Sequence, residues 1–186
     1  LPTALRAEPP ARFRAAEDVK MLAHNGLHFV LACLGHLGGR RLFCELREDA
    51  EALEFGRRLL RQEVVPALLA KHGDAVDRNE LLNYCDSIMR RVTCPVLRDS
   101  ISRGVRGVLR KLAPSERLVY SVRTVAEQGI EPLAFATSLA AAIEIAREGG
   151  ETEMGFDEVL TVTCGFDAAN DAQLLALIRQ QRNHLG

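Results

Sequence analysis

The chain has 186 residues, of which 47% are hydrophobic and 26% charged, so it can fold around one well-buried core but hardly around two. Its net charge of −1 gives no overall field that would favour nucleic acid or an anionic membrane as a partner. No apolar run in the sequence is long enough to span a membrane. Aromatic residues make up only 5% and tryptophan is absent, which favours a helical core of Leu, Ala, Val and Ile.

Helical patterns follow one another almost without interruption after a start that is rich in Pro and Arg. Residues 1–14 have no helical period and are typical of a linker or an entry strand. Glycine pairs and prolines mark the ends of the segments that follow. The expected helices cover residues 15 or 18 to 37, 48–71 with a kink or break at Pro66, 78–92, 114–127, 132–147, 156–163 and 167–182. Short helical pieces are expected in 98–112, and only 41–44 could form a short strand, so the predicted fold class is all-α.

The five cysteines indicate a reducing compartment. Their number is odd and no two form a CxxC pair, which argues against a structural zinc site or a disulfide framework. Buried free thiols are the simplest interpretation, and we expect a cytoplasmic protein.

The stretch KMLAHNGLH, residues 20–28, places polar groups in a largely apolar helix. At about 100° per residue, Lys20, His24 and His28 share one arc of the helix with Asn25. This arc could be an ordinary solvent-facing stripe. It could be a metal site through the two histidines, although no third ligand follows at a useful distance. It could also be a proton-transfer site, in which a lysine beside apolar walls acts as a base and the Asn and His hydrogen-bond a substrate oxygen.

Four segments in the same order resemble one family. Lys20, Asn25 and His28 form the pattern Lys-x4-Asn-x2-His, and RRVTCPVLRD, SRGVR and LRKL follow it at residues 90–99, 102–106 and 109–112. Over residues 18–150 the chain resembles the polyol-specific long-chain dehydrogenases, the mannitol dehydrogenase family. It departs from the family pattern at Val92 and Cys94, where Phe and Asn are usual, and at two glycines of the basic segment. The length downstream of the motifs is more similar to the compact mannitol-1-phosphate branch than to the longer mannitol 2-dehydrogenases.

The resemblance implies roles for single residues. Lys20 would be the general base, while Asn25 and His28 would position the reacting hydroxyl or carbonyl. Arg103 and Lys111 would contribute to the substrate pocket. The neighbouring Arg106 and Arg110 suit the non-reacting, anionic end of a substrate, or they belong to a solvated basic face. The resemblance gives His24 no role.

The resemblance also implies the domain organisation. The family binds NAD(H) or NADP(H) mainly on an N-terminal Rossmann domain, and this chain has no glycine-rich phosphate loop after a strand. We therefore expect residues 1–14 to be a linker from that domain. Residues 15–186 would be the helical substrate domain, of the type shared with 6-phosphogluconate dehydrogenase, and inactive without its partner domain.

Several alternatives stay open from the sequence. The substrate could be a sugar phosphate of the mannitol 1-phosphate/fructose 6-phosphate type or a sugar acid such as fructuronate or tagaturonate, whereas an unphosphorylated sugar alcohol fits least well. The chain could instead be a non-catalytic helical binding module. Arg90 and Arg91 are expected to be structural, pairing with carboxylates such as Asp86 or Asp99.

Overall fold

The computed structural model describes residues 10–185, and it confirms the all-α prediction, since this part of the chain contains helices and no strand. The α-helices are α1 Pro10–Val19, α2 Leu27–Leu37, α3 Ala50–Arg58, α4 Val65–His72, α5 Arg78–Val92, α6 Ile101–Val105, α7 Arg117–Glu127, α8 Leu133–Glu148, α9 Phe156–Glu158 and α10 Ala172–Asn183. Wider π-helical turns occur at η1 Lys20–Gly26, η3 Leu59–Val64 and η6 Val159–Thr163. Tighter 3₁₀ turns occur at η2 Phe43–Glu48, η4 Gly73–Ala75 and η5 Leu109–Leu112.

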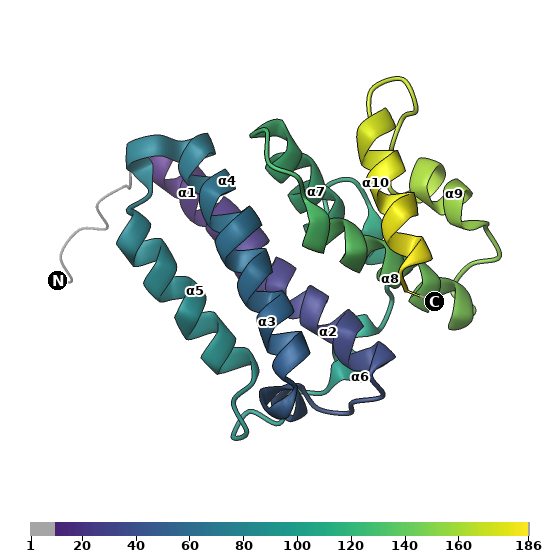
Figure 1. Ribbon diagram of the computed structural model, residues 1–186, viewed down its shortest axis with the longest axis horizontal. Helices are drawn as coiled ribbons and strands as arrows, with labels where there is room; N and C mark the ends of the chain where they lie inside the picture. Colours follow the sequence, from purple (N-terminus) through teal and green to yellow (C-terminus); the bar gives the residue numbers. More distant parts are fainter. Residues whose placement is uncertain (1–9, 186) are drawn as a thin grey trace, which may run out of the picture.

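The helices form two groups that meet along α2. Figure 1 shows α1, α3, α4 and α5 together on one side and α7 to α10 on the other. Helix α2 packs on α3 and α6 as well as on α8, and α10 packs on α8. The chain therefore returns to α2 from three separate regions of the sequence, which places side chains from those regions next to one another.

The first long helix runs from Pro10 to Leu37 and contains the π segment η1. It begins at Pro10, before the expected start at residue 15 or 18, so residues 10–14 are helical. A Cβ atom at Gly26 would lie 3.0 Å from Cε1 of Phe135, so the glycine allows η1 to approach α8 closely. The π turn widens the helix within the predicted polar stretch, and such bulges are frequent at functional sites.

The second long helix continues through Pro66 without breaking. A proline lacks the N–H donor and its ring clashes with the carbonyl four residues earlier. The π segment η3 immediately precedes α4, in which Pro66 is the second residue, and the i→i+5 bonding of a π turn moves that carbonyl away. The proline thus alters the helix but does not end it.

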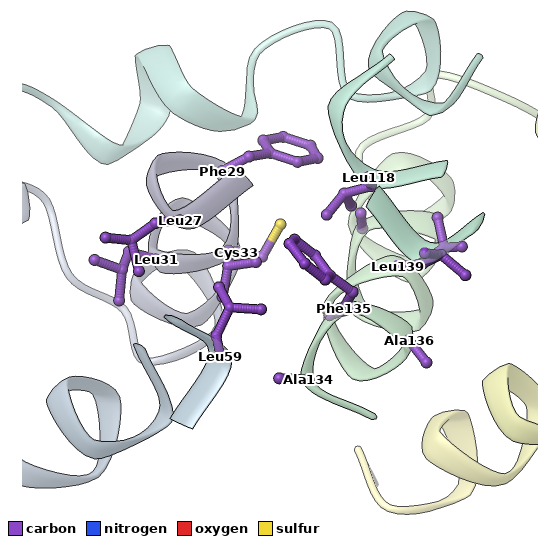
Figure 2. Packing of buried hydrophobic residues seen from close by; sticks show 14 of the residues in the cluster. Leu27, Phe29, Leu31, Cys33, Leu59, Leu118, Ala134, Phe135, Ala136 and Leu139 are labelled. Carbon is purple, nitrogen blue, oxygen red and sulfur yellow. The ribbon is translucent and has the colours of Figure 1, made fainter. Parts of the chain in front are cut away.

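Helix α8 is the most buried element of the core. Its buried face includes Phe135 and Leu139 together with a run of alanines that lets neighbouring helices approach closely. Figure 2 shows Phe29 and Cys33 of α2 pointing toward Phe135 and Leu118, so the core of the two groups is continuous across α2.

Two sequence expectations are wrong in detail. Within residues 41–44 only Leu42 makes a β-type contact, an isolated antiparallel bridge to Ser100. The last helix begins at Ala172 and not at 167, because the Asp171 carboxylate accepts the N–H of Asp167 and forms a turn there.

Candidate active site

A cleft of about 340 Å³ collects side chains from three regions of the sequence. Its walls come from the first long helix, from α6 with the turn before it, and from the segment that ends at the start of α7. The lining residues are His24, Asn25, His28, Asp99, Arg103, Gly104, Lys111 and Arg117.

His28 forms a hydrogen bond with Asp99, and both residues line this cleft. The distance from His28 Nε2 to Asp99 Oδ2 is 3.3 Å, and the imidazole ring packs on the Phe43 ring with centroids 4.3 Å apart. Burial lowers the pKa of His28, and the positive charges of His24 and Arg117 lower it further, although Asp99 acts in the opposite direction. A neutral imidazole near pH 7 can hydrogen-bond a substrate oxygen and accept or donate a proton.

The backbone holds Asp99 in a constrained position. The backbone carbonyl of Asp99 accepts the N–H of Phe43 at 3.0 Å. Its side-chain Oδ1 accepts the N–H of Ser100 at 3.0 Å. The preceding residue, Arg98, has a φ of 45°, a left-handed conformation that side chains rarely adopt outside turns and functional sites. Asp99, which the sequence predicts as a possible partner of Arg90 or Arg91 at the end of a family motif, lines the cleft.

Lys111 is a buried ammonium group that the fold orients toward the cleft. Its Nζ donates to the carbonyl of Gly104 at 2.6 Å and lies 5.5 Å from the centre of the Phe29 ring. Burial lowers the pKa of Lys111, and the nearby guanidinium groups of Arg117 and Arg110 add to this. The cleft therefore holds a cation that the described residues only partly neutralise.

Gly104 allows α6 to approach α2 closely enough for this contact. A Cβ atom at this position would lie 2.6 Å from Cβ of Ala32 and 3.3 Å from Cζ of Phe43. The glycine that departs from the family pattern is thus required by packing in this chain.

Arg117 is the first residue of α7 and reaches the cleft from the opposite wall. Its Nη2 lies 3.8 Å from Glu116 Oε2, which is too long for a hydrogen bond. Within residues 10–185 its Nε atom is buried without a hydrogen-bond partner. No sequence signal identified Arg117, because it stands outside the matched motifs.

The remaining predicted residues divide into two groups. Asn25, His28, Arg103 and Lys111 line the cleft together, as the sequence motifs suggested. Lys20 begins the π segment and is exposed, so the apolar walls expected around it are not provided by the described residues. His24, for which the sequence gave no role, lines the cleft, and burial with the charges of Arg91 and Lys20 lowers its pKa.

The other arginines of the motif lie elsewhere. Arg106 and Arg110 are exposed, and neither is among the described residues that line the cleft. The expected ion pairs of Arg90 and Arg91 with Asp86 or Asp99 are not found among residues 10–185. Asp86 pairs with Arg61 at 3.3 Å, and Asp99 pairs with His28 and Arg103.

Residues 10–185 contain no cluster of three or more His, Cys, Asp or Glu side chains that could hold a metal ion. In the same part of the chain, no helix is long and apolar enough to cross a membrane.

Comparison with known proteins identifies the family. The mannitol dehydrogenase C-terminal domain matches residues 14–180, which is most of the chain, so the chain belongs to this family. The mannitol-1-phosphate 5-dehydrogenase of Aspergillus fumigatus is 28% identical over 134 residues, covering 72% of this chain and 34% of that protein. The enzyme of the same name from Exiguobacterium is 33% identical over 124 residues, covering 67% of this chain and 32% of that protein. The chain therefore spans about a third of the length of the curated relatives it matches.

Proposed function

We propose that this chain is the substrate-binding and catalytic domain of an NAD(P)-dependent dehydrogenase that interconverts a secondary alcohol and a ketose. The observation that carries the proposal is the convergence of Asn25, His28, Arg103 and Lys111 in one cleft. These residues come from three motifs in two regions that lie far apart in the sequence. Membership of the mannitol dehydrogenase family and relatives named mannitol-1-phosphate 5-dehydrogenase support the same class of reaction.

The polar groups of the first helix suit the reacting end of the substrate. Asn25 and His28 can hydrogen-bond the oxygen that changes between hydroxyl and carbonyl, because both line the cleft and Asp99 holds the imidazole. Lys20 would take the hydroxyl proton in the oxidation and return it in the reduction. Because Lys20 is exposed in this chain, we expect the cofactor domain to enclose it together with the substrate.

The dinucleotide would bind outside the described residues. Residues 10–185 contain no strand followed by a glycine-rich turn, which is the arrangement that cradles a dinucleotide phosphate. A nicotinamide held by a separate domain would supply or accept the hydride. This chain would hold the substrate, move the proton and fix the substrate's orientation.

The cations of the cleft suit the far end of an anionic substrate. A sugar phosphate of the mannitol 1-phosphate type matches the substrate in the relatives' names. A sugar acid is the second candidate, because a guanidinium group binds a carboxylate as well as a phosphate.

The test uses the full-length product of the gene that encodes this chain. Oxidation of NADH or NADPH is measured with fructose 6-phosphate, fructuronate and fructose in parallel. We expect turnover with fructose 6-phosphate, and selective turnover of fructuronate would identify the sugar-acid reductase instead. Absence of turnover with all three substrates and both cofactors in a folded protein would contradict the proposal.

A variant tests the assignment of the base. Lys20→Ala should reduce kcat by at least about 100-fold, which is the usual contribution of a general base. The exposed position of Lys20 means that folding should be unaffected, which circular dichroism checks. Near-normal turnover of Lys20→Ala would remove Lys20 from the role of base.

A further inference from the structure

The cleft carries more positive than negative charge. Among the described residues that line it, Arg103, Lys111 and Arg117 are cationic, and Asp99 is the single carboxylate. That carboxylate is shared between His28 and Arg103, at 3.3 and 3.4 Å. Positive charge enclosed in a concave site without matching carboxylates favours an anionic ligand.

Arg117 differs from the well-paired arginines of the molecule. Arg123, for example, donates to both carboxylate oxygens of Asp171 at 2.8 and 2.9 Å and to the carbonyl of Gly165 at 2.8 Å. In the described part of the chain Arg117 has no hydrogen bond at its buried Nε. A buried donor without an acceptor costs free energy. The Nη groups of Arg117 also make no hydrogen bond to the described residues, and because they are not buried they can meet a ligand.

Arg117 is also separate from the exposed arginines of the basic segment. The side chain of Arg103 is 75% exposed, whereas that of Arg117 is 30% exposed and its Nε is inaccessible to solvent. Arg117 is close enough to His28 and Lys111 for its charge to lower the pKa of both groups. It therefore lies near both His28 and the buried ammonium of Lys111, in the same cleft.

We propose that Arg117 is a specificity-determining residue that binds the anionic group of the substrate through its Nη atoms. The planar edge of the guanidinium group, with two parallel N–H bonds, fits a phosphate or a carboxylate. Lys111, fixed by the Gly104 carbonyl, supplies a second positive charge to the same anion. The assignment of a substrate rests on the proposed function, whereas the binding of an anion by Arg117 does not.

The experiment compares Arg117→Met with Arg117→Lys and with a matched control, Arg78→Met. Arg78 is exposed and is the first residue of α5, just as Arg117 is the first residue of α7. Methionine keeps most of the side-chain volume, and lysine keeps the charge but not the planar pair of donors. Circular dichroism and thermal unfolding of each variant show whether it folds.

The kinetic arm uses the full-length gene product with fructose 6-phosphate, fructuronate and fructose. Arg117→Met should lower kcat/KM for the preferred anionic substrate at least tenfold, which is about the value of one hydrogen bond to a charged group. Arg117→Lys should recover only part of this, and Arg78→Met should match the wild type. The ratio of fructose 6-phosphate to fructuronate activity distinguishes a phosphate from a carboxylate ligand. An equal loss with anionic and neutral substrates would overturn the inference.

The binding arm does not depend on turnover. Inorganic phosphate is titrated into the wild type and each variant by calorimetry, and Arg117→Met should weaken its binding at least about tenfold. If the enzyme turns over none of the sugars but phosphate binding still requires Arg117, the proposed function fails and the anion site stands. If phosphate binds equally to the wild type and to Arg117→Met, the inference is wrong whatever the reaction.

Discussion

Two groups of charged side chains surround the middle of the first long helix, and they differ in how completely their charges are paired. At the end of α1, the buried Asp18 accepts from Lys71 at 2.9 Å and His72 at 2.8 Å through one oxygen, and from the hydroxyl of Tyr120 through the other. This group, which we call the Asp18 cluster, joins α1, α4 and α7. The cleft beside it has the opposite character, with cations in excess of carboxylates.

This difference in charge pairing distinguishes a cluster that stabilises the fold from a cleft that can bind a ligand. In the Asp18 cluster both carboxylate oxygens have partners from other helices, so its polar groups stabilise the packing and leave little for a ligand. In the cleft, the guanidinium group of Arg117 makes no hydrogen bond to the described residues, and its accessible Nη groups can meet a ligand. The same distinction places the catalytic proposal at the cleft, although the Asp18 cluster also brings several titratable groups together.

The largest expected effect comes from breaking the Asp18 cluster. Asp18→Ala leaves Lys71 and His72 partly buried without their carboxylate, so the free energy of unfolding should fall by about 3 to 5 kcal/mol. Urea unfolding of the 186-residue chain measures this. A loss below about 1 kcal/mol would show that the cluster does not hold the three helices together.

The next largest effect is expected at Glu63, a buried carboxylate that, unlike Asp18, has no cationic partner among residues 10–185. Glu63 accepts the N–H groups of Ala134 and Phe135 at the start of α8. Burial raises the pKa of Glu63 from 4.5 to about 7, although the two backbone donors oppose the shift. By contrast, hydrogen bonds from Tyr120, Lys71 and His72 lower the pKa of Asp18 despite its burial.

The raised pKa of Glu63 makes stability depend on pH in a defined direction. The folded chain holds the proton more tightly than the unfolded chain, so the stabilisation is complete below pH 4.5 and is lost as the pH rises to about 7. In urea unfolding, the stability of the wild type relative to Glu63→Gln should fall by about 3 kcal/mol across this range. Parallel pH profiles for the two proteins would contradict this account of Glu63.

A smaller effect is expected from removing a charge in the cleft. Arg117→Met should change the free energy of unfolding by less than about 0.5 kcal/mol, because the replacement removes an unsatisfied donor and a like-charge contact with Lys111. This is the direct counterpart of Asp18→Ala and is measured in the same urea series. A loss of several kcal/mol would mean that Arg117 is a structural residue like Asp18.

The smallest effect concerns the imidazole in the cleft. Arg117→Met should raise the pKa of His28, because the guanidinium charge no longer opposes protonation of the ring. A pH titration of the His28 ring signals by NMR measures the shift, with Arg78→Met as the control. An unchanged pKa would show that Arg117 and His28 are not electrostatically coupled.

The sequence predicts the helices well and the cleft in part. Glycine pairs and prolines are local signals, so α2, α5 and α8 end close to the expected residues. The π segment at 20–26 could not be predicted, because it depends on the approach of Gly26 to Phe135, more than one hundred residues away in the chain. It also changes the angular spacing from which the polar arc was derived.

The site residues also divide into those with a local sequence signal and those placed by tertiary packing. Asn25, His28, Arg103 and Lys111 belong to recognisable motifs, and the fold brings them together. Arg117 carries no local signal, since an arginine at a helix start is usually exposed. Its burial arises only when α7 packs against the first helix, which is a tertiary effect.

The most direct test of the central claim is an NMR titration of the arginine Nε–H signals of the ¹⁵N-labelled 186-residue chain with inorganic phosphate. We expect one signal, absent from the spectrum of Arg117→Met, to shift with added phosphate while the signals of Arg106 and Arg110 stay in place. If phosphate shifts the exposed arginines alone, or shifts the same signals in Arg117→Met, the cleft is not the anion site and the account is contradicted.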